Sequence, residues 1–183
     1  MKNQIVLALA ALIASTPLAS AKNTNDDWKW KNTHYKTYGE WTTVCEDRSD
    51  DETVKRCYLR YVDAYAREPF GAFFVFVTIV EKSPHFSFEF ERGTNFTGNW
   101  NVTADTSEIW TFDPANCPSR AECILSSEQG TMLAKALAAP DAKLNFKFTD
   151  REDRKLDRDW PGDSQFADAF NDLQQQTAQR MAN

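Results

Sequence analysis

Four cysteines constrain the fold of this chain more than any other feature. Cys45 and Cys57 enclose eleven residues that are nearly all polar or charged, and Cys117 and Cys123 enclose five. Such pairs can act as metal ligands, as a redox couple or as disulfide staples. The compartment of the chain decides among these uses, because disulfides persist mainly in oxidising surroundings.

The N-terminus indicates export. The apolar run "IVLALAALIA" follows Lys2, and Ala19-Ser20-Ala21 has the small-x-small pattern of a cleavage site. We therefore expect residues 1–21 to be a secretory signal peptide and the mature chain to begin near Lys22. The run is shorter than the ~20 apolar residues that cross a bilayer, so we expect no integral membrane span. The predicted location is the periplasm or bacterial cell envelope, with secretion as an alternative.

Charge and length bound the partners and the domain count. The formal net charge is −6, and loss of Lys2 with the signal peptide makes it −7. Basic residues are scattered and outnumbered, which argues against nucleic acid and against an anionic membrane surface as partners. The remaining length suits one domain. We assign residues 22–34 to a flexible leader and residues 35–183 to this single domain.

In an exported chain, the four cysteines are expected to form disulfides. Zinc sites need closer Cys/His groupings, and a thioredoxin-like motif needs C-x-x-C; neither spacing occurs here. Four cysteines allow three pairings, and spacing alone does not choose among them. The strand pattern favours the local pairs Cys45–Cys57 and Cys117–Cys123, because the first two cysteines end and begin two neighbouring strands with their inward faces in phase.

Several segments alternate as β-strands do. We expect strands in "YGEWTTVC", "CYLRYVDAYA", "GAFFVFVTIVE", "HFSFEFE" and "AKLNFKFTD", and one around Ile109 to Phe112. "GAFFVFVTIVE" is apolar on both faces, which predicts a central strand that is covered on both sides. "HFSFEFE" alternates cleanly, with Phe86, Phe88 and Phe90 directed inward.

Two segments show helical spacing. "SSEQGTMLAKALAAP" predicts a helix capped by Ser126 or Ser127 and stopped by Pro140. "DSQFADAFNDLQQQTAQR" predicts an amphipathic C-terminal helix capped by Asp163 or Ser164. Its apolar stripe consists of Phe166, Ala169, Phe170 and Leu173. The charge-dense "REDRKLDRDWPGD" between them is expected to be a solvated loop.

The order of these features resembles the invasion associated locus B (IalB) family of bacterial envelope proteins. The resemblance rests on the signal peptide, "YGEWTTVCE" with a second cysteine a dozen residues on, the apolar hairpin, "CPSRAEC", "LNFKF" and "FADAFNDL". It implies a mainly β, immunoglobulin-like β-sandwich with a short helix and a C-terminal amphipathic helix, stapled by disulfides at Cys45, Cys57, Cys117 and Cys123. The founding member is associated with host-cell invasion. "REDRKLDRDWPGDSQF" departs from the family pattern, which has a short apolar strand there.

Candidate catalytic and metal-binding residues are sparse. Neither His34, which falls in the leader, nor His85, on an exposed strand face, has a Ser or Cys nucleophile and an orienting carboxylate beside it in sequence. The pair Glu89 and Glu91 is typical of a solvated sheet face. The 46–56 loop contains "EDRSDDE", which can attract calcium weakly but lacks the order and glycine of an EF-hand loop. We expect no catalytic residue, cofactor or specific metal site.

Aromatic residues offer a different kind of site. "WKWKNTHYKTYGEW" gathers tryptophans and tyrosines near the mature N-terminus, and exposed aromatic residues can form a protein or glycan contact surface. Trp41 and Trp110 are expected in the core instead. We expect an exported, non-catalytic envelope protein that binds another protein or acts in host interaction. The alternatives are a carboxylate-dependent periplasmic hydrolase, favoured by clustered buried carboxylates, and a structural or stress-protective protein.

Overall fold

The computed structural model describes residues 29–104, 107–117, 122–139, 141–161 and 164–182 of the chain. The expected signal peptide and residues 22–28 of the expected leader lie outside these ranges. So do Pro140 and Asp163, which the sequence places at helix ends. Neither helix of the described part is long and apolar enough to cross a membrane.

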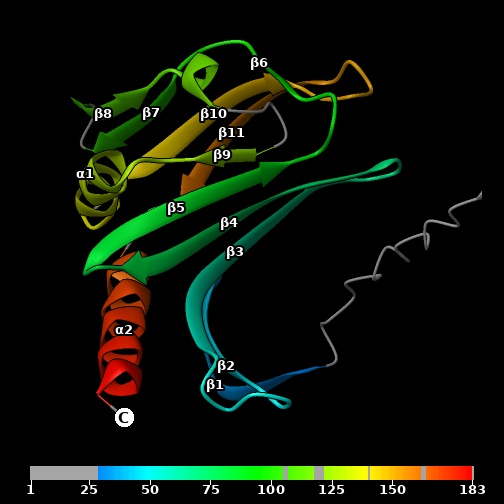
Figure 1. Cartoon of the computed structure of the whole chain (residues 1–183). Helices are drawn as coiled ribbons and strands as arrows, with labels where there is room; N and C mark the ends of the chain where they lie inside the picture. The colour runs from blue at the N-terminus through cyan, green and yellow to red at the C-terminus, as the bar shows by residue number, and fades with distance from the viewer. Residues whose placement is uncertain (1–28, 105–106, 118–121, 140, 162–163, 183) are drawn as a thin grey trace, which may run out of the picture.

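The larger of two sheets has six antiparallel strands in the order β1-β2-β3-β4-β5-β9 (Figure 1). Its strands are β1 (Trp30–Tyr38), β2 (Trp41–Arg48), β3 (Lys55–Arg67), β4 (Phe70–Val80), β5 (Ser83–Phe90) and β9 (Glu122–Ile124). The first five follow one another in space as in sequence, because hairpin turns and one longer loop join them. In the β1–β2 turn Gly39 has a φ of 57°, which glycine adopts without steric cost.

The smaller sheet has the order β11-β10-β7-β8, and the short β6 pairs with β10. Its strands are β6 (Asn95–Phe96), β7 (Trp100–Ala104), β8 (Ser107–Phe112), β10 (Lys143–Thr149) and β11 (Lys155–Pro161). A short 3-10 helix, η2 (Pro114–Asn116), follows β8. All pairs in this sheet are antiparallel.

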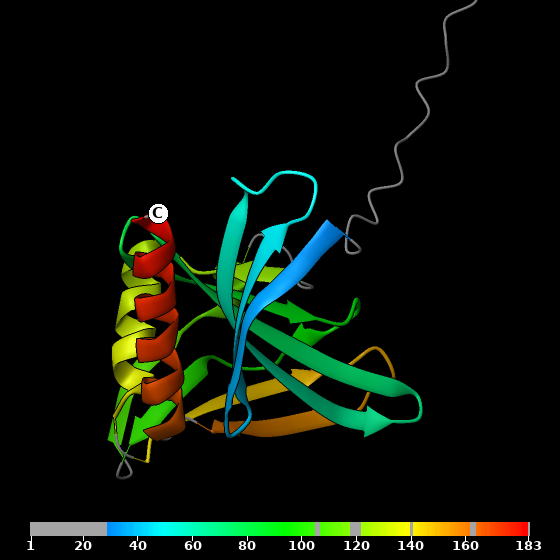
Figure 2. The ribbon, with the colours of Figure 1, turned by 90° about the horizontal axis from the view of Figure 1, so that it is seen from below.

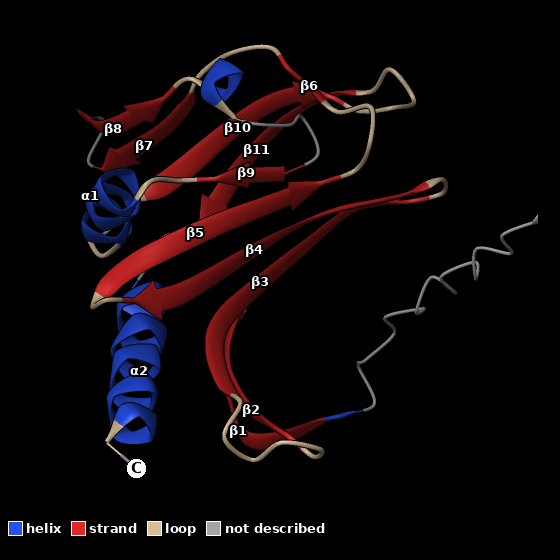
Figure 3. Ribbon diagram, in the orientation of Figure 1, coloured by secondary structure: helices blue, strands red, loops and turns tan. Residues whose placement is uncertain are grey.

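The larger sheet curls into a half-barrel, and α2 (Ser164–Met181) lies on its concave side, against β2 and β3 (Figures 1 and 3). The other helix, α1 (Ser127–Leu137), packs on β5. Figure 2 shows both helices on the same side of the molecule. The α1 backbone approaches β5 closely, because a Cβ atom at Gly130 would lie 2.3 Å from the carbonyl oxygen of Pro84.

The core between the sheets and helices is strongly aromatic. The ring of Trp100 in the smaller sheet lies 4.8 Å from that of Phe88 in the larger sheet and 5.1 Å from that of Phe146. From α2, Phe166 packs edge-on against Trp41 at 5.0 Å. All five side chains are at most 1% exposed. Burial of such large apolar surfaces is the main force that holds the sheets and helices together.

The structure confirms the mainly β class, the antiparallel sheets, the α1 helix and the C-terminal helix. The half-barrel differs from the flatter layer of an immunoglobulin-like sandwich, because α2 fills the concave side of the larger sheet. The expected stripe of α2 is buried at Phe166, Ala169 and Leu173 and half-buried at Phe170. Ser126, one of the two serines expected to cap α1, does so by accepting a hydrogen bond from the Gln129 N–H.

Two segments expected to lack regular structure are strands. Residues 30–34 of the expected leader belong to β1, which pairs with β2 from Trp30 to Tyr38 with one bulge at Thr33. Residues 155–161 of the expected charged loop form β11, which pairs with β10. Both are edge strands with largely exposed side chains, so no apolar alternation marks them in the sequence. Backbone hydrogen bonds to one neighbouring strand order these segments, and their side-chain pattern does not reveal this.

Candidate functional site

Each histidine has a hydrogen-bond partner from a distant part of the chain. His34 lies in β1 and its Nε2 is 2.9 Å from Oδ2 of Asp172 in α2. His85 lies in β5 and its Nε2 is 3.0 Å from Oγ of Ser127 at the start of α1. The sequence missed both partners, since they are 138 and 42 residues away. His34 thus contacts a carboxylate and His85 a hydroxyl, and these hydrogen bonds bring a hydroxyl and a carboxylate together at neither histidine.

The polar contacts of the 46–56 loop engage its carboxylates. Asp50 accepts hydrogen bonds from Nε and Nη2 of Arg48 and pairs with Lys29, and these contacts hold its pKa well below the usual range. Asp51 accepts hydrogen bonds from the Thr53 N–H and hydroxyl. Within the described ranges, no group of three or more His, Cys, Asp or Glu residues is placed to hold a metal ion.

Two disulfides join the cysteines as the local pairing scheme has it, Cys45–Cys57 and Cys117–Cys123. Cys45 and Cys57 are directly opposed in the β2–β3 ladder. The bond therefore ties the loop between these strands to the sheet, with Cys45 fully buried and Cys57 partly exposed. A disulfide in this position is a staple for the curled part of the larger sheet.

Aromatic and aliphatic side chains line the convex surface of the larger sheet, which faces away from the core. We call this surface the outer face and define it by Trp30, Tyr35, Tyr58, Val62, Phe74, Phe76 and Ile124. Tyr35, Val62 and Ile124 are 59%, 42% and 53% exposed. The expectation that β4 is covered on both sides is wrong, because Phe74 and Phe76 project to this side and are only partly buried.

A network of ring contacts orders one end of the outer face. The Arg56 guanidinium lies 3.8 Å from the centre of the Trp30 ring and 5.6 Å from that of Tyr58. Its Nε donates a hydrogen bond to Glu46, which fixes the guanidinium plane between the rings. Tyr58 in turn meets Phe76 edge-on at 6.0 Å. Cation–π and edge contacts of this kind hold rings rigidly at a surface, and rigid exposed aromatic side chains are favoured at protein interfaces.

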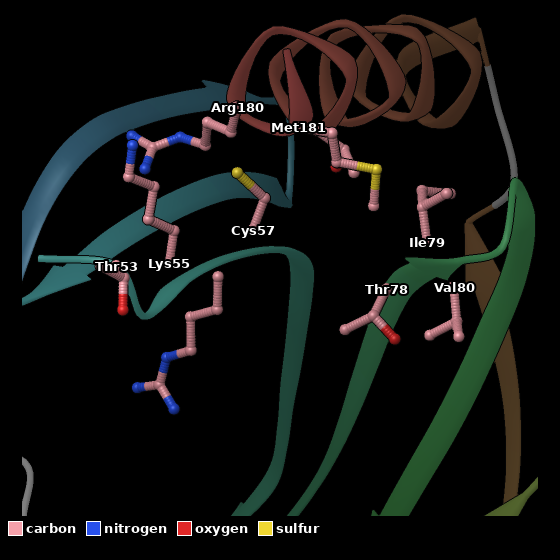
Figure 4. A pocket seen from close by; sticks show the side chains of 10 residues that line it. Thr53, Lys55, Cys57, Thr78, Ile79, Val80, Arg180 and Met181 are labelled. Carbon is pink, nitrogen blue, oxygen red and sulfur yellow. The ribbon is translucent and has the colours of Figure 1, made fainter. Parts of the chain in front are cut away.

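A second feature lies where β3 and β4 part. Their ladder stops at Leu59 and Val77. Before Leu59, the β3 residues 55–58 pair with β2, and after Val77 the β4 residues 78–80 pair with β5. The two strands therefore diverge, as Figure 1 shows, and the last turns of α2 lie across the gap (Figure 4). We call this place the β3–β4 split.

The split forms a groove of about 450 Å³. Its walls are the start of β3 and residues 78–80 of β4, and Thr177, Arg180 and Met181 of α2 close it from the inside. Figure 4 shows Lys55 and Arg180 at one side of the groove and Ile79, Val80 and Met181 at the other. The groove therefore has a cationic end and an apolar end.

The charges of the groove are all positive. Lys55, Arg56 and Arg180 line it, and no lining residue is acidic. Arg56 binds Glu46, and Arg180 binds Asp47 and Thr33; none of these three partners lines the groove. Lys55 forms no ion pair with any residue of the described part. Lys55 is therefore the lining cation that no carboxylate of the described part neutralises.

The sequence pointed to part of these surfaces. Of the aromatic residues near the mature N-terminus, Trp30 and Tyr35 lie on the outer face. Trp41 and Trp110 are core residues as expected, 1% and 6% exposed. The groove had no sequence signal, because its walls come from three separated segments. The outer face had one further hint, the second apolar face of "GAFFVFVTIVE", which is too apolar for a strand with one solvated side.

Comparison with solved structures places the fold. The chain matches the crystal structure of invasion associated protein B from Bartonella henselae with a TM-score of 0.52 and 14% sequence identity, over 80% of this chain and 99% of that one. At this identity the match shows a shared fold. No protein-family model matches the chain, and no curated protein matches it in sequence.

Proposed function

We propose that the chain is an exported, non-catalytic protein of the bacterial cell envelope that binds another protein through the outer face. The observation that carries this proposal is the exposed apolar surface on the side of the larger sheet that faces away from the core. Solvent-exposed apolar patches of this kind mark interaction sites, since water contact with them is unfavourable. The rigid Trp30–Arg56–Tyr58 stack supports it, as aromatic and Arg side chains carry much of the energy at protein interfaces.

Export and location are part of the same proposal. Two disulfides favour an oxidising compartment, the periplasm or the outside of the cell. The similar structure belongs to a protein described as invasion associated, and host interaction is the setting we propose for the partner. Signal-peptide removal is tested by intact-mass analysis of protein from its native host, which should start at or next to Lys22. Full-length chain recovered from the membrane fraction would contradict export as a mature protein.

Binding through the outer face is tested by two matched variants. Val62 on the outer face and Ile109 on β8 of the smaller sheet are 42% and 43% exposed. Val62→Glu should abolish mild crosslinking to the partner in intact envelopes, because it places a charge in the contact. Ile109→Glu should leave the crosslinked band unchanged. Equal crosslinking by both variants would refute the outer face as the binding surface.

A non-catalytic role is tested separately at His85. His85→Ala removes the hydrogen bond to Ser127 and should leave partner crosslinking as it is in the wild type. A hydrolytic activity of the purified protein that this substitution abolishes would favour an enzyme instead.

A further inference from the structure

The β3–β4 split has the properties of a peptide-binding groove. We infer that it takes up a short, extended, acidic segment of a partner protein, which adds as a strand between the diverging ends of β3 and β4. This inference rests on the proposed role in protein binding and names a contact separate from the outer face.

The first argument is the state of the strand edges. In an antiparallel strand, the N–H and C=O groups of alternate residues point to opposite sides. Residues 55–58 use one side for β2, and residues 78–80 use one side for β5. The other side of each strand faces the split, where the described chain provides no strand to pair with it. An extended peptide supplies the missing backbone donors and acceptors, which is the basis of recognition by strand addition.

The second argument is the shape and lining of the groove. Each wall contributes three consecutive residues, Lys55 to Cys57 and Thr78 to Val80, a length of roughly 10 Å. This suits a segment of a few residues. Ile79, Val80 and Met181 offer apolar contact to alternate side chains of such a segment. Val80 and Met181 are 47% and 72% exposed, so they present apolar surface to solvent when the groove is empty.

The third argument is charge. Lys55 and Arg180 lie at one end of the groove, Lys55 forms no ion pair within the described part, and no lining residue is a carboxylate. An acidic segment complements this sign, whereas a basic one is repelled. An acyl chain fits the apolar end less well than a peptide does, because it leaves the strand edges without hydrogen-bond partners.

The experiment uses three fluorescein-labelled heptapeptides with the mature protein. The probes are DVEVDVE, its basic counterpart KVKVKVK, and DVPVPVE, whose prolines remove backbone donors. Fluorescence anisotropy should show that DVEVDVE binds at least about tenfold more tightly than either of the others. Amide hydrogen exchange should show slower exchange on binding in residues 55–58 and 78–80. Equal binding of the acidic and basic probes, or protection confined to other strands, would overturn the inference.

Two charge reversals locate the site. Lys55→Glu should weaken DVEVDVE binding by about fivefold or more, and Lys143→Glu, at an exposed position of β10, should leave it unchanged. Wild-type binding by Lys55→Glu would also overturn the inference. These results are separable from the test of the proposed function. If Val62→Glu loses crosslinking to the partner but still binds DVEVDVE, the result supports the outer face and leaves the groove unaffected. Conversely, partner crosslinking with no specific peptide binding would leave the outer face standing and remove the groove.

Discussion

Tyr65 in β3 shows how burial controls a single side chain. Its ring meets Phe148 edge-on at 5.4 Å, and its hydroxyl is buried without a hydrogen-bond partner among the described residues. Burial, assisted by the carboxylates of Glu91 and Asp150, raises the pKa of Tyr65 to about 12. The folded protein therefore favours the protonated phenol over the phenolate.

Tyr65→Phe should be neutral at pH 7 or stabilise the fold by up to about 1 kcal/mol, because it removes an unpaired buried hydroxyl. In the wild type, the raised pKa of Tyr65 contributes to the free energy of unfolding. This contribution is complete below the unfolded pKa of 10.0 and is lost as pH rises through about 12. The variant should lack this part of the alkaline loss. Urea denaturation between pH 8 and pH 12 measures the difference, with Tyr35→Phe as the exposed control. If the free energy of unfolding falls equally with rising pH in the wild type and in Tyr65→Phe, Tyr65 is not responsible for the alkaline loss of stability.

Sequence reasoning works at this scale where a residue follows a regular pattern. The inward positions Phe86, Phe88 and Phe90 alternate, and all three are buried. It fails where a contact joins distant segments, as at His34 and Asp172. Local spacing carries no information about which helix face a strand residue will meet.

At the scale of the element, α1 depends on a close approach that only glycine permits. In an exposed helix interior, replacing Gly by Ala stabilises by about 1 kcal/mol. At Gly130 the new Cβ would lie 2.3 Å from a backbone oxygen of β5, so the helix must move away from the sheet.

Gly130→Ala should therefore destabilise the protein by about 1–3 kcal/mol despite its better helix propensity. Gly98→Ala is the control, since a Cβ there meets nothing within 4 Å. Thermal and urea denaturation compare the two. A Gly130→Ala variant that is more stable than the wild type would mean that α1 is not held this close to β5.

Helix α2 is joined to the edge of the larger sheet by the hydrogen bond between Asp172 and His34. Burial alone would raise the pKa of Asp172, but hydrogen bonds from His34, Thr43 and Tyr38 outweigh it and lower the pKa below 3.8. The carboxylate thus stabilises the fold above pH about 3.8, and this contribution is lost as pH falls through the lowered pKa.

Asp172→Asn should cost about 1–2 kcal/mol near neutral pH, because it weakens a charged hydrogen bond at a largely buried position. The difference from the wild type should shrink below pH about 3.8. Asp168→Asn, an exposed position on the same helix, is the control. Urea denaturation from pH 7 to pH 3 follows both, and a pH-independent difference would contradict the role of the carboxylate.

The elements themselves divide by how they are buried. Strands and helices with one packed face were predictable, because packing imposes a period of two or 3.6 residues. The edge strands β1 and β11 were not, since backbone pairing orders them and their side chains face water. The split between β3 and β4 was hidden for a similar reason. It arises from the curl of the whole sheet.

At the scale of the whole molecule, the disulfides act on the unfolded chain. Closing the Cys45–Cys57 loop removes chain entropy worth roughly 3 kcal/mol, and the smaller Cys117–Cys123 loop about 2.4 kcal/mol. Replacing both Cys45 and Cys57 by Ala should therefore destabilise more than replacing Cys117 and Cys123. Urea denaturation of the two double variants tests the order. The reverse order would show that native contacts at the smaller loop outweigh the entropy of the larger one.

The placement of α2 sets the order in which the molecule can be completed. Phe166, Ala169 and Leu173 cover the concave side of β2 and β3, which precede α2 by the greater part of the chain. A chain that folds as it is made from its N-terminus must therefore wait with a half-covered aromatic sheet until α2 arrives. During that interval the sheet is open to wrong partners. Folding is thus expected to be completed only after α2 has been made, and removing α2 should favour aggregation over a smaller native domain.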